Sequence, residues 1–324
     1  MRGLVTVFGK ELADYFTGWR GIILFIVVLL AAIFAIYGPS GALENIREEL
    51  STPTQFGATQ FVFLKLFTTS GKGSPSFLYF ITMFLVPIIG IALGFDAINS
   101  EKNSGTLGRL LSQPIYRDAV FNGKFFAGMV TIGIMLTTII LLVSGLGLRL
   151  IGVAPGSEEV FRLLIFLILT TIYGAFWLGL AMLFSVFFQR VATSALAAIA
   201  IWIFFIFFAL MISGFIANTL VPIGETSTMQ DLIRNASIQI TAMRVSPLAL
   251  FQEATTILLV PNARTMGEIL QLQHVSGALY MPGALPLGQS LLTIWPHIVT
   301  IVGITAVFFA ISYARFMREE IRST

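Results

Sequence analysis

Residues 163–188 read LLIFLILTTIYGAFWLGLAMLFSVFF, a stretch of 26 residues that contains no charged side chain. Residues 192–217 form a second uncharged stretch of the same length, and only a few residues around Gln189 and Arg190 separate the two. A helix needs about 20 mostly apolar residues to cross the hydrocarbon core of a bilayer. The two stretches therefore predict two consecutive membrane-spanning helices.

The whole chain has the composition of a membrane protein. Hydrophobic residues make up 56% of its 324 residues and charged residues 11%, whereas roughly 25% of the residues in soluble domains are charged. So few ionised side chains do not cover a water-soluble globule of this size. The net charge of +3 is too small for a nucleic-acid interface. The absence of Cys excludes disulfides, thiolate metal ligands and a cysteine nucleophile.

The same criterion finds four further uncharged apolar stretches in the chain. The six expected spans are 21–37, 77–95, 125–148, 163–188, 192–217 and 291–313. We therefore expect an all-α integral membrane protein in which residues 21–324 form one six-span domain. The longest connection, 218–290, is too short for an ordinary nucleotide-hydrolysing domain, so any energy source must be another chain.

Residues 1–20, before the first span, predict an amphipathic helix on the cytosolic membrane interface. Thr6, Lys10 and Asp14 recur on its polar side. Its apolar side carries Leu4, Val5, Phe8, Leu12, Tyr15, Phe16 and Trp19. Such an apolar side packs on lipid while the polar side faces water. A cleavable signal peptide is the alternative, but Glu11 and Asp14 argue against it.

The basic residues indicate which side of the membrane each connection faces. With both termini on one side, that side carries eleven of the 19 Lys and Arg residues, in roughly half as many loop residues as the other side. Lys and Arg are retained in the cytosol during membrane insertion. We therefore expect a multi-pass protein of the cell membrane, with both termini and the link 96–124 in the cytosol.

Small and aromatic residues within the spans indicate how the helices pack. Gly90 and Gly94 fall on one face of the second span, which permits the close approach of another helix. Trp177 and Trp202 lie deep within their spans and are expected to fill the bundle, whereas Trp295 lies near a span end, as an interfacial anchor would.

The expected spans offer few side chains for chemistry. Ion-driven carriers place ionisable side chains at membrane depth, and the six spans contain no Asp, Glu, Lys or Arg. His297, near the outer end of the last span, is expected to act in hydrogen bonding. The chain has no Gly-x-x-x-x-Gly-Lys-Ser/Thr phosphate loop, so we do not expect it to bind ATP itself. We expect no catalytic residue, although an intramembrane hydrolase that pairs a Ser with a His is an alternative.

The link between the second and third spans, 96–124, has the most informative sequence. Ser104 is expected to begin a short helix that Pro114 ends. The apolar edge of that helix consists of Leu107, Leu110 and Leu111. An apolar edge on a segment that faces the cytosol predicts a protein partner. The alternative is that the leucines pack on the membrane surface or on the bundle.

A group of residues in and around this link follows a known pattern. They are Phe95, Asp96, Ala97, Ile98, Glu101, Gly105, Thr106, Leu107, Leu110, Leu111, Pro114, Gly123 and Lys124. The combination resembles the signature of ABC type-2 exporter permeases. The amphipathic entry helix, the six spans and the Ser246-Pro247 pair extend the likeness over nearly the whole chain. Within the family, the chain looks most similar to permeases that act in maturing the copper sites of nitrous oxide reductase.

The resemblance implies a transmembrane permease subunit of an ATP-binding-cassette exporter. ATP and Mg would be bound by a separate cytosolic ABC ATPase subunit, and this chain would hold no cofactor. A second permease subunit, identical or different, would complete a dimer. The linking helix would dock in a groove of the ATPase, with Glu101, Gly105, Thr106, Leu107, Leu110, Leu111 and Pro114 as the coupling residues.

The long connection 218–290 is expected to hold amphipathic helices outside the membrane. Ser246-Pro247 opens a run of helical spacing that ends at Pro261. The apolar positions of this helix include Pro247, Leu250, Phe251 and Ala254. The resemblance implies that such helices cap the exit of the translocation path, so an outer gate is one interpretation and simple packing is the other.

Two further features of the outer connections have less specific interpretations. One interpretation is a soft copper site at Met229, Met243, Met266, His274 and Met281, because thioether and imidazole groups suit Cu(I). Scattered Met residues in apolar helices are commoner, so no metal site is expected. The first outer loop, 38–76, is expected to be solvated surface, including its apolar run from Phe61 to Phe67.

A function of a different class explains the link equally well. A membrane anchor or assembly subunit would also dock a cytosolic partner, but it would move no solute. Stimulation of ATP turnover by a substrate separates that function from transport.

Overall fold

The structure, a computed structural model, describes residues 2–37, 61–69, 76–106, 115–152, 154–224, 227–261 and 284–318. Every regular element in these ranges is a helix. Five helices are long and apolar enough to cross a membrane, and the bent pair formed by the first two helices adds a sixth if it counts as one span. The expected all-α membrane fold is confirmed.

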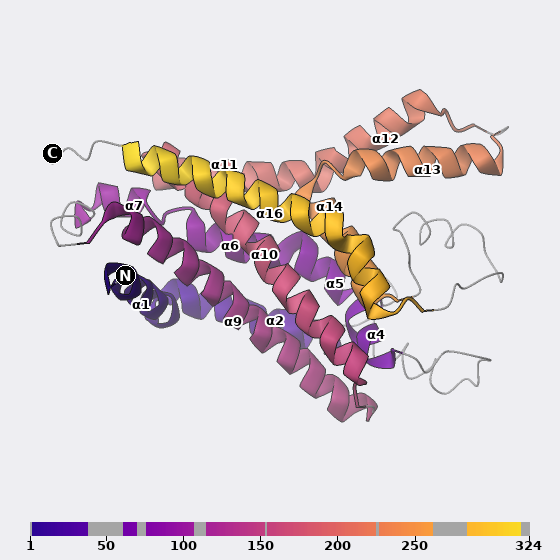
Figure 1. The fold of residues 1–324 in the computed structure, drawn as a ribbon, viewed down its shortest axis with the longest axis horizontal. Coiled ribbons are helices and arrows are strands. Elements are labelled where there is room, and N and C mark those ends of the chain that lie inside the picture. The colour runs from indigo at the N-terminus through magenta and orange to yellow at the C-terminus, as the bar shows by residue number, and fades with distance from the viewer. Residues whose placement is uncertain are drawn as a thin grey trace.

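The elements follow one another along the chain as shown in Figure 1. They are α1 (Arg2–Thr17), α2 (Trp19–Tyr37), α4 (Val62–Thr68), α5 (Phe77–Phe80), the π-helix η1 (Ile81–Leu85), α6 (Val86–Gly94), α7 (Asn99–Asn103), α9 (Arg117–Ile151), α10 (Ser157–Phe187), α11 (Val191–Ile203), the π-helix η2 (Phe204–Phe208), α12 (Ala209–Leu220), α13 (Met229–Met243), α14 (Pro247–Leu259) and α16 (Leu287–Arg318).

The long helices extend beyond the uncharged stretches that predicted them. A helix continues past the hydrocarbon core until a capping residue ends it. α9 ends at Gly152, whose φ of 77° is the left-handed conformation that terminates many helices. α10 begins after Gly156, whose backbone N–H donates to Glu159 Oε2 at 2.7 Å. The uncharged stretches therefore lie within longer helices and do not mark the ends of those helices.

Both described ends of the chain lie at the same end of the bundle. In Figure 1, the start of α1, the helix α7 and the end of α16 lie on the left, whereas α4 and the start of α10 lie at the opposite end. We call the first the link end, because α7 belongs to the link 96–124, and the second the loop end. An even number of crossings agrees with this arrangement.

α10 is the central helix of the bundle, and α6 packs directly against it (Figure 1). The side chains of Tyr173 and Trp177 on α10 are fully buried. Gly90 and Gly94 lie against α10, because a Cβ at Gly94 would lie 2.8 Å from the Leu178 carbonyl oxygen. The predicted close approach at these glycines is confirmed, as is the burial of Trp177.

We expect Gly94→Ala to destabilise this helix pair. The new Cβ would also lie 2.8 Å from Ala181 Cβ, and a backbone carbonyl cannot rotate away as a side chain can. Overpacking of this kind costs roughly 1–3 kcal/mol of unfolding free energy. The thermal midpoint of the purified chain in detergent measures the loss. Gly145→Ala is the matched control, because nothing lies within 4 Å of its added Cβ. Equal midpoints for the two variants would contradict the packing argument.

The first two helices differ from the prediction at Trp19. The chain breaks at Gly18, and the axes of the two helices differ by 61°. Trp19 therefore begins α2, where it is exposed, instead of belonging to the interfacial helix. α1 does not lie freely on lipid either, because it packs along α9 with Val7 and Glu11 buried.

Two predictions about the loop end were wrong. The run from Phe61 to Phe67, expected as solvated surface, includes most of α4, whose Phe63, Leu64 and Phe67 are buried in the core. The helix α14, expected to be amphipathic, is buried on most sides between α10, α16 and α4. Both segments are apolar enough to enter the bundle. They fall in the long connections between the expected spans, so sequence reasoning placed them outside it.

One span lies at the edge of the bundle, with its first part packed on α10 and most of its surface exposed. Only 6% of the most apolar stretch of the span Val191–Leu220 is buried, compared with 50% and 67% for α9 and α10. Its last part, α12, pairs with α13, and this helical hairpin projects from the bundle at the upper right of Figure 1.

Candidate functional site

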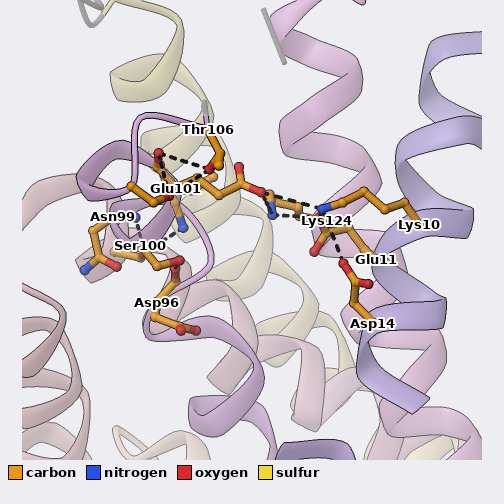
Figure 2. Close-up of polar contacts among 12 residues, drawn as sticks. Lys10, Glu11, Asp14, Asp96, Asn99, Ser100, Glu101, Thr106 and Lys124 are labelled. Atoms are coloured by element: carbon orange, nitrogen blue, oxygen red, sulfur yellow. Dashed lines mark hydrogen bonds and ion pairs between the residues drawn. The ribbon is translucent and has the colours of Figure 1, made fainter. Parts of the chain in front are cut away.

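Three segments meet in a buried ionic cluster at the link end, which we call the link cluster: Glu11 of α1, Glu101 of α7 and Lys124 of α9. Figure 2 shows the lysine reaching between the two carboxylates. Lys124 Nζ lies 2.9 Å from Glu11 Oε1 and 2.9 Å from Glu101 Oε1. The three side chains are 4%, 9% and 13% exposed, so the contacts are shielded from water.

The sequence builds this cluster by bringing α1 unusually close to α9. A Cβ at Gly123 would lie 2.8 Å from Val7 Cγ1, so only glycine permits the observed approach. The next residue, Lys124, then points at Glu11 on the facing helix. The Gly-Lys pair before the third span thus has a physical role: the glycine permits contact and the lysine fixes it.

Two lysine side chains favour the ionised form of Glu11. Burial disfavours the charged form of Glu11, but Lys124 and Lys10 outweigh that effect and lower the pKa of the Glu11 carboxyl. Lys10 Nζ lies 3.1 Å from Glu11 Oε1 and 3.3 Å from Asp14 Oδ2, at the half-exposed rim of the cluster. Since a buried charge costs several kcal/mol when unpaired, the three segments are held in one arrangement.

The first part of the link is also docked on the end of α10. The backbone N–H groups of Ile98 and Asn99 donate to Ser185 Oγ at 2.9 and 3.1 Å. These bonds give an acceptor to N–H groups at the start of α7 that have no partner within the helix. In return, Lys102 Nζ donates to the Val186 carbonyl at 3.4 Å and Asn103 Nδ2 donates to the Gln189 carbonyl at 3.0 Å. The link thus contacts the short turn between α10 and α11.

The coupling residues of the sequence analysis fall partly within the described chain. Glu101 belongs to the link cluster, and Gly105 takes a φ of 68°, a conformation that glycine adopts without strain. Thr106 Oγ1 donates to the Glu101 carbonyl at 3.3 Å. Ser104 directly follows α7, and most of the helix that we expected it to begin lies outside the described residues. Leu107, Leu110, Leu111 and Pro114 lie outside the described residues.

A second contact ties the elbow between α1 and α2 to the end of α6. Arg20 Nη1 forms an ion pair with Asp96 Oδ2, and the guanidinium lies 5.6 Å from the centroid of the Phe95 ring. Tyr15, an expected interfacial residue, donates its hydroxyl hydrogen to the Leu93 carbonyl at 3.2 Å. The Asp of the signature therefore anchors the entry helices at the point where the second span ends.

The other expected interfacial residues have mixed environments. Phe8 and Leu12 are half-buried, and the Phe16 ring lies 5.4 Å from that of Phe25 across the elbow. Sequence reasoning missed the pairing of Glu11 with Lys124. A signal was present, because Glu11 falls on the same helical stripe as Leu4, Phe8 and Tyr15, where a surface helix would carry an apolar residue.

A second buried polar group joins α14 to α16. Arg244 donates to both carboxylate oxygens of Glu253 at 2.9 and 2.8 Å, and His297 Nε2 lies 3.0 Å from Glu253 Oε2. Burial raises the pKa of Glu253, but the hydrogen bonds from His297 and Arg244 outweigh it and lower the pKa to about 2. The expected hydrogen-bonding role of His297 is confirmed.

The residues proposed for an outer gate all lie on this buried helix. Pro247, Leu250, Phe251 and Ala254 are buried. Among the described residues, no group of three or more His, Asp or Glu side chains is placed to hold a metal ion. Of the five residues considered for copper, only Met229 and Met243 lie within the described chain.

Comparisons with known proteins identify the family of this chain. A family model for ABC-2 family transporter proteins matches residues 5–321. A curated relative from Stutzerimonas stutzeri, the probable ABC transporter permease protein NosY, is 30% identical over 131 residues. That alignment covers 38% of this chain and 45% of the relative, so the chain matches less than half of the relative's length. The family match extends from α1 to the end of α16. The chain therefore belongs to the ABC-2 family of transporter proteins.

Proposed function

We propose that this transmembrane ABC transporter subunit is the permease of an exporter, driven by ATP that a separate cytosolic subunit binds with Mg and hydrolyses. The link cluster is the observation that carries the proposal. It joins the link to α1 and α9 through charges that are costly to separate. A force applied to the link by a partner would therefore be transmitted to the entry helix and to the third span together.

The proposal places the link end in the cytosol. This orientation rests on the basic residues counted in the sequence, and it puts the link cluster where an ATPase subunit could reach it. In the proposal, Leu107, Leu110 and Leu111 dock in the partner, while Glu101 connects the docked segment to the bundle. Glu101 forms an ion pair with Lys124 within the chain, so we assign it a positioning role and not a docking role.

The proposal also includes a second permease subunit. The span Val191–Leu220 supports this part, because it exposes large apolar side chains such as Phe207 and Phe215 along most of its length. Pairing through this span would let two copies enclose a path between them. A membrane anchor would show the same docking surface, so the measurement that separates the two functions is stimulation of ATP turnover by a transported solute.

We expect Leu110→Asp to disrupt binding of the ATPase subunit. A carboxylate placed on the apolar edge would lose its water on docking, which should weaken the complex roughly tenfold or more. Co-purification of the partner from membranes, with ATP turnover of the complex, measures the effect. Ser112→Asp is the matched control, because it adds the same charge away from the leucine edge. If Leu110→Asp retains the partner and its ATP turnover as well as Ser112→Asp does, the docking role is wrong.

A further inference from the structure

One turn of the second span is wound as the π-helix η1, and this leaves two backbone carbonyls without helical donors. The Val86 N–H donates to the Ile81 carbonyl, five residues back. In an α-helix this N–H would donate to the Thr82 carbonyl, which therefore loses its usual donor. The next residue is Pro87, which has no N–H to give to Thr82 or to Met83. A proline directly after a π-turn thus leaves the carbonyls of Thr82 and Met83 without a backbone donor inside a membrane bundle.

Two aromatic side chains from other spans supply the missing donors. The Tyr173 hydroxyl on α10 donates to the Thr82 carbonyl at 3.2 Å, and Trp202 Nε1 on α11 donates to the Met83 carbonyl at 2.8 Å. Tyr173 is fully buried, so no water competes for this bond. Buried carbonyls away from water require a partner. Each of the two carbonyls that lack a backbone donor receives a hydrogen bond from a facing aromatic side chain. We therefore interpret η1 as a site of bending that these two side chains stabilise.

Tyr173 also connects this joint to the helix α14. Its ring stacks on Phe251 with a centroid distance of 4.1 Å and an interplanar angle of 5°. α14 in turn is tied to α16 through Glu253 and His297. At its other end, the second span continues through α6 into the link. Tyr173 therefore contacts both the second span, which leads into the link, and α14, the helix considered as an outer gate.

We propose that Tyr173 and Trp202 are positioning residues that hold η1, and that Tyr173 links the movement of the second span to α14. When the link moves, the second span yields at η1, where the helical ladder is interrupted, and the stacked Tyr173–Phe251 pair carries the displacement to α14. The consequence for transport rests on the function proposed above. The linkage itself is a property of this chain and is measurable without a partner.

Hydrogen–deuterium exchange of the purified full-length chain tests the proposal. Tyr173→Phe removes one hydroxyl and keeps the ring. We expect exchange in peptides covering η1 and the start of α6 to become roughly twofold to tenfold faster, the range for one lost hydrogen bond. Exchange in α14 should also quicken, because the ring loses its anchor. Trp202→Phe should accelerate hydrogen–deuterium exchange in η1 and leave the exchange rate of α14 unchanged.

Tyr313→Phe is the matched control, because Tyr313 of α16 stacks on Phe309 and lies away from η1. It should leave both regions unchanged. If Tyr173→Phe leaves η1 at the unmodified rate, the joint is not held by this bond. If Tyr173→Phe accelerates exchange in η1 but not in α14, the proposed linkage between the second span and α14 is wrong. Equal acceleration in α9 would show a general loss of stability and would also overturn the proposal.

Discussion

Replacing Lys124 with methionine is expected to lower the unfolding free energy of this protein by roughly 3–5 kcal/mol, the usual cost of leaving buried charges unpaired. Methionine keeps the length of the side chain but removes the cation that Glu11 and Glu101 share. α1 should then separate from α9. The thermal midpoint in detergent and the rate of proteolysis within α1 measure these effects.

Lys10→Met is the matched control for this prediction. Lys10 also contacts Glu11, at 3.1 Å, but its side chain is 50% exposed, so its loss should cost only about 0–1 kcal/mol. Combining Lys124→Met with Glu11→Gln and Glu101→Gln should recover much of the stability, since the unpaired charges are then gone. Equal effects of Lys124→Met and Lys10→Met, or no recovery in the triple variant, would contradict the account of the link cluster.

Arg162→Leu is expected to have an effect of similar size at the loop end. Arg162 of α10 is fully buried. Its guanidinium donates to the carbonyls of Leu258 and Leu285, to Ser290 Oγ and to Glu158. These acceptors belong to the end of α14, the approach to α16, α16 itself and α10. Removing the guanidinium leaves all four acceptors without this partner, at a cost of roughly 3–5 kcal/mol. The thermal midpoint measures the loss.

Two controls sharpen the test of Arg162. Arg149→Leu removes an exposed guanidinium near the same end of the bundle and should change little. Arg162→Lys keeps the charge but loses the planar guanidinium with its several N–H donors. Its thermal midpoint should therefore lie between those of the unmodified chain and Arg162→Leu. If Arg162→Leu is as stable as Arg149→Leu, the guanidinium does not hold α14 and α16 in place.

Part of the candidate site was predictable from the sequence. The link 96–124 was recognisable because Glu101, Gly105 and Lys124 follow a pattern in a chain with few charges. The pairing of Lys124 with Glu11 was not predictable, because 113 residues separate them and their distance depends on how α1 lies on α9. Only the glycine at 123 and the polar residue in the apolar stripe of α1 hinted at the contact.

The same division applies to the fold. The sequence by itself determined that the chain crosses a membrane in helices, and where the apolar part of each span lies, because transfer into lipid depends on local composition. Only the tertiary structure decided that α4 and α14 enter the bundle, that α1 packs against α9, and that η1 receives Tyr173 and Trp202. These outcomes depend on which helices meet, and a buried carbonyl or charge is satisfied by whichever residue the packing brings to it.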